Sequence, residues 1–112
     1  MAKSDPKDDN DPRSVKVSVT FTAAVLAVES CTIDGVTVRL SRGAGDKFTG
    51  DASIIPSSDK RPFRLTFRAP SGTDFEVVVK ARGKKLLEES DTSDKARFTI
   101  AESIVVPLAA DA

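Results

Sequence analysis

Strict alternation of apolar and polar residues, beginning just after residue 14, is the feature that most constrains this chain. In SVKVSVTFT, Val15, Val17, Val19 and Phe21 alternate with lysine, serine and threonine. When the pattern repeats every two residues, alternate side chains lie on opposite faces of a β-strand. β-Branched residues favour the strand conformation. The stretch therefore predicts a half-buried strand and directs the interpretation toward a β-protein.

Further strands are indicated along the rest of the chain. An Asp-Gly turn signal at residues 34 and 35 precedes a second apolar alternation through VTVRLSR. Residues 23–30 also suit a helix by composition, but the flanking pattern favours a strand with a bend near Ala23 or Ala24. A short strand is expected over residues 47–55, between two loops rich in glycine and proline.

The last third of the chain continues in the same way. KKLLEES adds a short strand, DTSD predicts a turn, and ARFTI and SIVVPL close the domain. In one uninterrupted strand Glu102 would share the inward phase, so we expect a bulge or turn at residues 101–103. Pro107 lacks an amide donor, which suits an edge strand.

Many short strands with turn signals at regular spacing, and no convincing long helix, indicate an all-β fold. The architecture expected is an antiparallel β-sandwich of immunoglobulin-like character, with a small β-barrel as the alternative. The cysteine pair, core tryptophan and corner tyrosine of immunoglobulin domains are absent from the sequence.

The length of 112 residues suits one domain. We place this domain at residues 14–109. Residues 1–13 contain prolines and several aspartates and have no apolar residue after Ala2, so they predict a disordered polar tail.

The stretch RPFRLTFRAPSGTDFEVVVKAR, residues 61–82, predicts a β-hairpin that turns at APSGT. If Ala69 faces Thr73, Phe67 lies opposite Phe75 and the apolar residues share one face. The other face then presents a group of cationic candidates for binding, namely Arg64, Arg68, Lys80 and Arg82.

The neutral total charge conceals a segregated distribution. Residues 60–85 carry eight Lys or Arg against two acids, whereas residues 86–112 carry two against six. Such a basic face keeps a sheet soluble, docks an anionic partner, or is neutralised within the domain by acids from Leu86 onward. For the second case we expect the partner to be another protein with an acidic surface.

Catalysis, cofactors and nucleic-acid binding are disfavoured. The chain has no histidine and no tyrosine, and Cys31 is its single cysteine, so we expect a protein that is not an enzyme, with no cofactor and no metal site. Strand geometry places Phe63 and Phe67 on the face opposite Arg64 and Arg68, whereas a nucleic-acid platform needs aromatic and basic side chains on one surface. Cys31 is interpreted as a small apolar strand residue.

The sequence thus predicts a monomeric, non-catalytic interaction or adaptor module. The alternatives are a structural spacer or shell and assembly component, and a small-ligand-binding β-barrel. No apolar run approaches the roughly 20 residues of a transmembrane helix. As written, the chain predicts a cytoplasmic protein, or an extracytoplasmic one if it starts after a removed signal segment.

Overall fold

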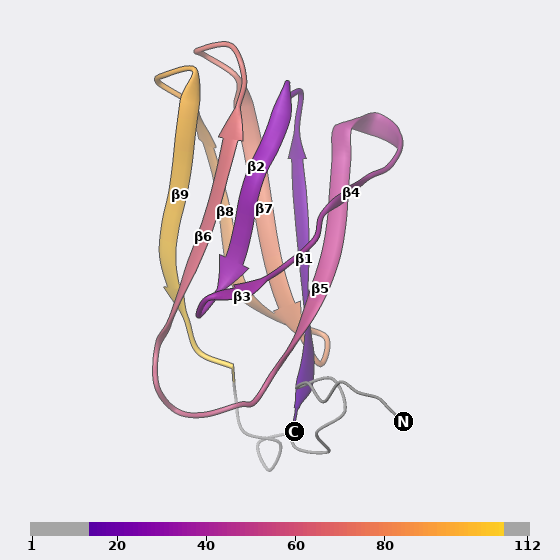
Figure 1. Ribbon diagram of the computed structural model, residues 1–112, viewed down its shortest axis with the longest axis vertical. Helices are drawn as coiled ribbons and strands as arrows, with labels where there is room; N and C mark the ends of the chain where they lie inside the picture. The colour runs from indigo at the N-terminus through magenta and orange to yellow at the C-terminus, as the bar shows by residue number, and fades with distance from the viewer. Residues whose placement is uncertain (1–13, 107–112) are drawn as a thin grey trace.

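The computed structural model describes residues 14–106, which form two antiparallel sheets packed face to face as a sandwich (Figure 1). The five-stranded sheet has the order β4-β5-β1-β7-β8, and the four-stranded sheet has the order β3-β2-β6-β9. The predicted tail, residues 1–13, and residues 107–109 lie outside the described residues. The strands are β1 (Val15–Ala23), β2 (Ala27–Ile33), β3 (Val36–Thr37), β4 (Ser41–Arg42), β5 (Lys47–Ile54), β6 (Arg61–Arg68), β7 (Asp74–Ala81), β8 (Lys84–Thr92) and β9 (Arg97–Ile104).

The alternation at the start of the domain produces the central strand β1, as predicted. β1 pairs with β5 on one side and β7 on the other. Val17, Val19 and Phe21 point between the sheets and are fully buried, while the residues between them are partly or fully exposed. Removing this apolar surface from water contributes most of the stabilisation of such a core.

Phenylalanines join the two sheets. The ring of Phe67, from β6, lies 5.0 Å from that of Phe21 and 5.5 Å from that of Phe75, between ring centroids. Tilted and edge-on arrangements of this kind are favourable for aromatic pairs. The predicted inward residues Phe21, Phe63, Phe67 and Phe75 are buried and Phe98 is partly buried, and Phe48 also lies in the core.

The predicted hairpin at residues 61–82 is wrong in its pairing. β6 pairs with β2 and β9, whereas β7 pairs with β1 and β8, so the two strands belong to different sheets. The apolar pattern is satisfied because Phe67 and Phe75 meet across the sandwich rather than side by side. The connection between β6 and β7, residues 69–73, is held by Ser93. The carbonyl of Ser93 accepts from the amide of Gly72, and its amide donates to the carbonyl of Thr73.

The strand predicted after residues 34 and 35 is broken into two short ones. The turn itself forms, with positive φ at both Asp34 and Gly35, and joins β2 to β3. β4 then pairs with β5 in the other sheet, so the chain crosses between the sheets over residues 38–40. This crossing passes so close to Gly50 that a β-carbon there would lie 2.1 Å from the carbonyl oxygen of Arg39.

Most of the other strand predictions are confirmed. Residues 23–30 contain no helix, and the chain bends over residues 24–26 between β1 and β2. β5 forms where expected, whereas β8 extends to Thr92 and takes in the first two residues of the turn predicted at DTSD. The bulge predicted at residues 101–103 is wrong, because β9 pairs with β6 in continuous register. β9 is an edge strand, and Glu102 therefore occupies an inward position while its side chain stays exposed.

Candidate anion-docking surface

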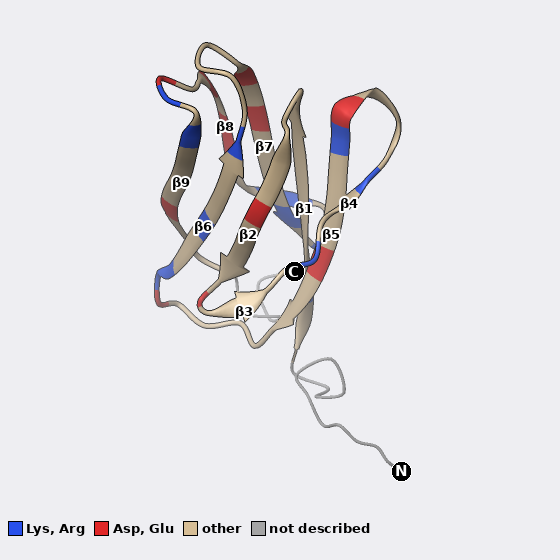
Figure 2. Ribbon diagram, turned by 45° about the horizontal axis from the view of Figure 1, so that its top comes forward, with Lys and Arg blue, Asp and Glu red and all other residues tan. Residues whose placement is uncertain are grey.

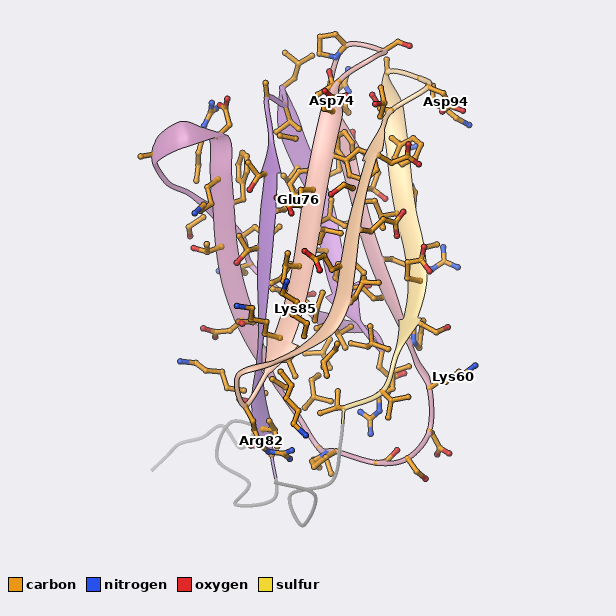
Figure 3. The ribbon with its side chains drawn as sticks, turned by 180° about the vertical axis from the view of Figure 1, so that it is seen from behind. Lys60, Asp74, Glu76, Arg82, Lys85 and Asp94 are labelled. Atoms are coloured by element: carbon orange, nitrogen blue, oxygen red, sulfur yellow. The ribbon has the colours of Figure 1, made fainter. Side chains whose placement is uncertain are left out.

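The structure divides the four predicted binding residues between two opposite faces of the sandwich. Arg64 and Arg68 alternate with the buried residues of β6 and lie on the outer face of the four-stranded sheet. Lys80 lies on the outer face of the five-stranded sheet, and Arg82 lies in the turn where β7 ends (Figure 3). The four residues do not form one surface, because β6 and β7 are not neighbours.

The basic residues of the four-stranded sheet are partly neutralised within the fold. Arg68 lies directly opposite Arg97, an arrangement of like charges that is unfavourable by itself. Glu29 relieves it, since its carboxylate lies 2.7 Å from Nε of Arg97 and 3.7 Å from Nε of Arg68. The register shift in β2 falls at Glu29. Arg64, flanked by Thr32 and Ala101, forms no ion pair with the residues described.

A second and larger group of cations surrounds the other two predicted residues. Lys80 lies between Ser18 on β1 and Lys85 on β8, so two lysines face each other directly across paired strands. We call this group the basic end. It comprises five exposed residues, Lys16, Lys80, Arg82, Lys84 and Lys85.

Acids compensate the basic end only in part. Lys85 forms an ion pair of 3.1 Å with Glu88, and Lys16 lies 3.9 Å from Asp51. Both pairs are exposed, and exposed pairs contribute little to stability. Neither Lys80 nor Lys84 forms an ion pair within residues 14–106. In contrast to the Arg68 and Arg97 pair, no carboxylate of the described residues bridges Lys80 and Lys85.

The turn at the basic end has an unusual residue for its geometry. Arg82 has φ 52° and Gly83 has φ 78°, the positive values of a two-residue type I′ turn. Asn, Asp and Gly are the residues that favour the first of these positions, and Asp34 occupies the equivalent place in the turn after β2. The members of the basic end not predicted from the sequence are Lys16, Lys84 and Lys85, although the A-R-G-K stretch carries a turn signal.

Acidic side chains gather at the other end of the same sheet. Asp74 and Glu76 lie at that end of β7, with Asp94 nearby in the loop after β8 (Figure 3). Figure 2 shows the same polarity along β7, red at one end and blue at the other. The outward side chains of β7 are thus electrostatically polarised along the strand, whereas β5 carries Lys47 toward the acidic end and Asp51 toward the basic end.

Among residues 14–106, two side chains have clearly shifted pKa values. Burial raises the pKa of the Cys31 thiol to about 12, so the thiolate needed for nucleophilic chemistry is not populated near neutral pH. The pKa of Glu89 rises to about 7, chiefly through a hydrogen bond with Glu102 and then through burial. Cys31 is a buried strand residue, as predicted.

Two further findings concern metals and membranes. Among residues 14–106 no three His, Cys, Asp or Glu side chains are grouped so as to hold a metal ion. The same part of the chain contains no helix whose length and apolar character would let it cross a membrane.

Comparison with known proteins yields no match among family models, curated proteins or solved structures. The class to which the molecule belongs is therefore defined by its architecture, a sandwich of two antiparallel sheets with five and four strands.

Proposed function

We propose that the protein is a non-catalytic docking module that binds an acidic protein through the basic end. The observation that carries this proposal is that Lys80 of β7 pairs directly with Lys85 of β8, and no carboxylate of the described residues lies between the two ammonium groups as a bridge. Directly opposed like charges destabilise a sheet. Local features that work against the fold are expected mainly where function requires them, and an acidic partner would relieve the repulsion.

The surface beside the basic end supports the same proposal. Ser18, the neighbour of Lys80, also lines an open hollow of about 710 Å³ on the five-stranded sheet. Arg39 lies in the lining, where it forms no ion pair with the described residues. The other lining residues are Val19, Gly50, Asp51 and the hydroxyl-bearing Thr20, Thr37, Ser41 and Thr49. Hydroxyl groups that donate and accept suit the mixed polar groups of a protein surface.

The absence of aromatic residues from the basic end favours a protein over a nucleic acid. Single-stranded nucleic acids are held by aromatic side chains on which bases stack, beside a basic groove. All six phenylalanines of the sequence belong to the core or pack against it. The basic end therefore offers charge and hydrogen bonding without a stacking platform.

Charge reversal tests the proposal. We expect Lys80→Glu combined with Lys84→Glu to weaken binding of a polyglutamate peptide at least tenfold, measured by fluorescence anisotropy at low salt. Binding of the unaltered protein should weaken as salt is raised, because contacts between exposed charges are screened. Duplex DNA and vesicles containing anionic lipid are measured in parallel, and tighter binding to either would contradict a preference for acidic protein.

The matched control is Arg64→Glu combined with Arg68→Glu, which reverses two exposed charges on the opposite face. This variant should bind polyglutamate within about twofold of the unaltered protein, since electrostatic contacts act locally at moderate salt. Equal losses in the two variants would mean that net charge, and not the basic end, governs binding. Circular dichroism and urea unfolding verify that both variants are folded.

The immunoglobulin-like character inferred from the sequence is also a proposal. Its support is architectural, namely two antiparallel sheets of short strands packed face to face. Immunoglobulin constant domains order their strands ABED and CFG, whereas here β1 lies between β5 and β7. The proposed likeness is therefore to the sandwich architecture of immunoglobulin domains and does not extend to their strand order.

A further inference from the structure

One long edge of the five-stranded sheet has no partner strand among the described residues. β8 pairs with β7 on one side, and the sheet ends there. β9 runs beside it at the edge of the other sheet but pairs with β6 (Figure 1, Figure 3). The backbone amides and carbonyls along the outer edge of β8 are therefore placed to accept a further strand.

The charges of β8 are segregated along the strand. Its sequence, KKLLEESDT, begins with Lys84 and Lys85 and continues through two leucines to Glu88 and Glu89. Charged residues usually protect an exposed edge from pairing. Here the two signs occupy separate halves, so they repel a parallel copy of the strand and attract an antiparallel one.

A bulge in the middle of β8 decides which side chains share a face. The pairing with β7 shifts because Leu86 is an extra residue, between Lys85 opposite Lys80 and Leu87 opposite Val79. Both leucines are partly buried and pack against the core, so they point to the same side of the strand.

The residues of β7 fix the side on which each charge of β8 lies. Lys84 and Glu89 pair with buried residues of β7, so their side chains lie on the inner side of β8. Lys85 and Glu88 pair with residues of β7 that are not buried, and they lie on the outer side. Each side of the strand thus has a lysine before the bulge and a glutamate after it.

We propose that two copies of this chain pair through β8 in an antiparallel, two-fold symmetric dimer centred between Leu86 and Leu87. The residues opposed in this register are Lys84 and Glu89, Lys85 and Glu88, and Leu86 and Leu87. Each contact occurs twice, as a two-fold axis requires. Because the bulge reverses the alternation, every opposed pair lies on one side of the extended sheet.

Neighbouring registers match less well. A shift of two residues in one direction places the leucines opposite the glutamates, and a shift in the other direction places the lysines opposite the leucines. The ion pair that Lys85 forms with Glu88 inside one copy is exposed, so little stability is lost when these side chains also contact a second copy.

Pairing between copies goes beyond the proposed docking function and does not depend on it, although both use Lys84 and Lys85. The basic end also includes Lys16 and Lys80, which lie on β1 and β7 and not on the paired edge. A dimer would replace the monomer expected from the sequence.

Sedimentation velocity of the full-length protein at pH 8, above the pKa of about 7 of Glu89, tests the pairing. An added strand of nine residues is small beside the roughly 1,200–2,000 Å² of a standard interface, so we expect weak association, visible at about 0.1–1 mM protein. Lys84→Glu with Lys85→Glu, or Glu88→Lys with Glu89→Lys, should weaken association at least about tenfold, because like charges then face each other. An equimolar mixture of the two variants should restore it, since an acidic strand then meets a basic one.

The matched control is Asp51→Lys combined with Glu76→Lys, which changes the net charge as much as the second variant but at exposed positions away from β8. It should associate within about twofold of the unaltered protein. Glu88→Lys with Glu89→Lys should also keep its binding to polyglutamate, because the basic end is intact. Loss of pairing and loss of docking are therefore separate results.

Circular dichroism verifies that the variants are folded. A chain carrying all four reversals on β8 is self-complementary again and should dimerise, which keeps the test decisive if a double variant folds poorly. Three results would each overturn the pairing: an unaltered protein that stays monomeric at about 1 mM, a dimer indifferent to both reversals, or a mixture that fails to associate.

Discussion

At Gly50 the space that a β-carbon would fill is occupied by the backbone of residues 38–40. We call these residues, which pass from one sheet to the other, the crossing segment. A β-carbon would lie 2.1 Å from the carbonyl oxygen of Arg39 and 2.9 Å from its carbon. Both atoms belong to the backbone, which cannot rotate away as a flexible side chain would. Gly50 thus allows residues 38–40 to pass beside β5 on their way from one sheet to the other.

We expect Gly50→Ala to lower the free energy of unfolding by about 1–3 kcal/mol, the usual cost of overpacking. Urea unfolding followed by circular dichroism measures the change. Gly43→Ala is the matched control, because a β-carbon there meets its nearest neighbour at 3.5 Å and the residue has an ordinary φ of −113°. Equal stabilities of the two variants would show that the crossing segment does not approach β5 so closely.

At the scale of strands, the bulge in β2 has an identifiable electrostatic role. The register of β2 against β6 shifts between Val28 and Ser30, and the carboxylate of Glu29 lies between Arg68 and Arg97. The outer face of the four-stranded sheet can therefore carry two directly opposed arginines at little cost. At the basic end of the other sheet, no acid among residues 14–106 bridges two cations in this way.

We expect Glu29→Gln to lower the free energy of unfolding by about 0.2–1 kcal/mol, as for partly exposed ion pairs. The loss should be larger at low salt, because the unbridged repulsion of Arg68 and Arg97 is then less screened. Thermal unfolding at two salt concentrations measures both effects. Glu76→Gln, which removes an acid that forms no ion pair among the described residues, should change stability less and with weaker salt dependence.

Strand positions were predictable from the sequence, whereas strand partners were not. Period-two alternation located β1, β6 and β7, because the phase of burial depends only on neighbours along the chain. Pairing depends on contacts between distant segments. The matching apolar residues of β6 and β7 satisfy a hairpin and a crossing between sheets equally well, so Phe67 and Phe75 could be placed in the core without being placed in the same sheet.

The candidate site was predictable to the same extent. Lys80 and Arg82 were identified from the charge pattern, but Lys16 joins them only because β1 pairs with β7. The wrong bulge prediction for residues 101–103 had a similar origin. It assumed that an inward glutamate must be buried, whereas the inner face of this edge strand opens to solvent at Glu102.

For the whole molecule, the sheet order requires most pairing to occur between distant parts of the chain. β1, at residues 15–23, pairs with β7, at residues 74–81, and β2 pairs with β6. Among the described strands, β7 and β8 are the one long pair joined by a tight turn. Closing large loops costs entropy before the contacts they permit are formed, so such topologies fold slowly.

We therefore expect refolding from urea to take roughly milliseconds to seconds, as for other sandwiches dominated by non-local pairing. Stopped-flow measurement of the fluorescence of an extrinsic apolar dye, together with circular dichroism, gives the rate, because the chain has no tryptophan or tyrosine. Refolding in microseconds would contradict the observed strand order, since it would require mostly local contacts. Gly50→Ala, measured in parallel, then reports whether residues 38–40 already lie beside β5 in the transition state. A substitution in the folding nucleus slows refolding, while one elsewhere mainly speeds unfolding.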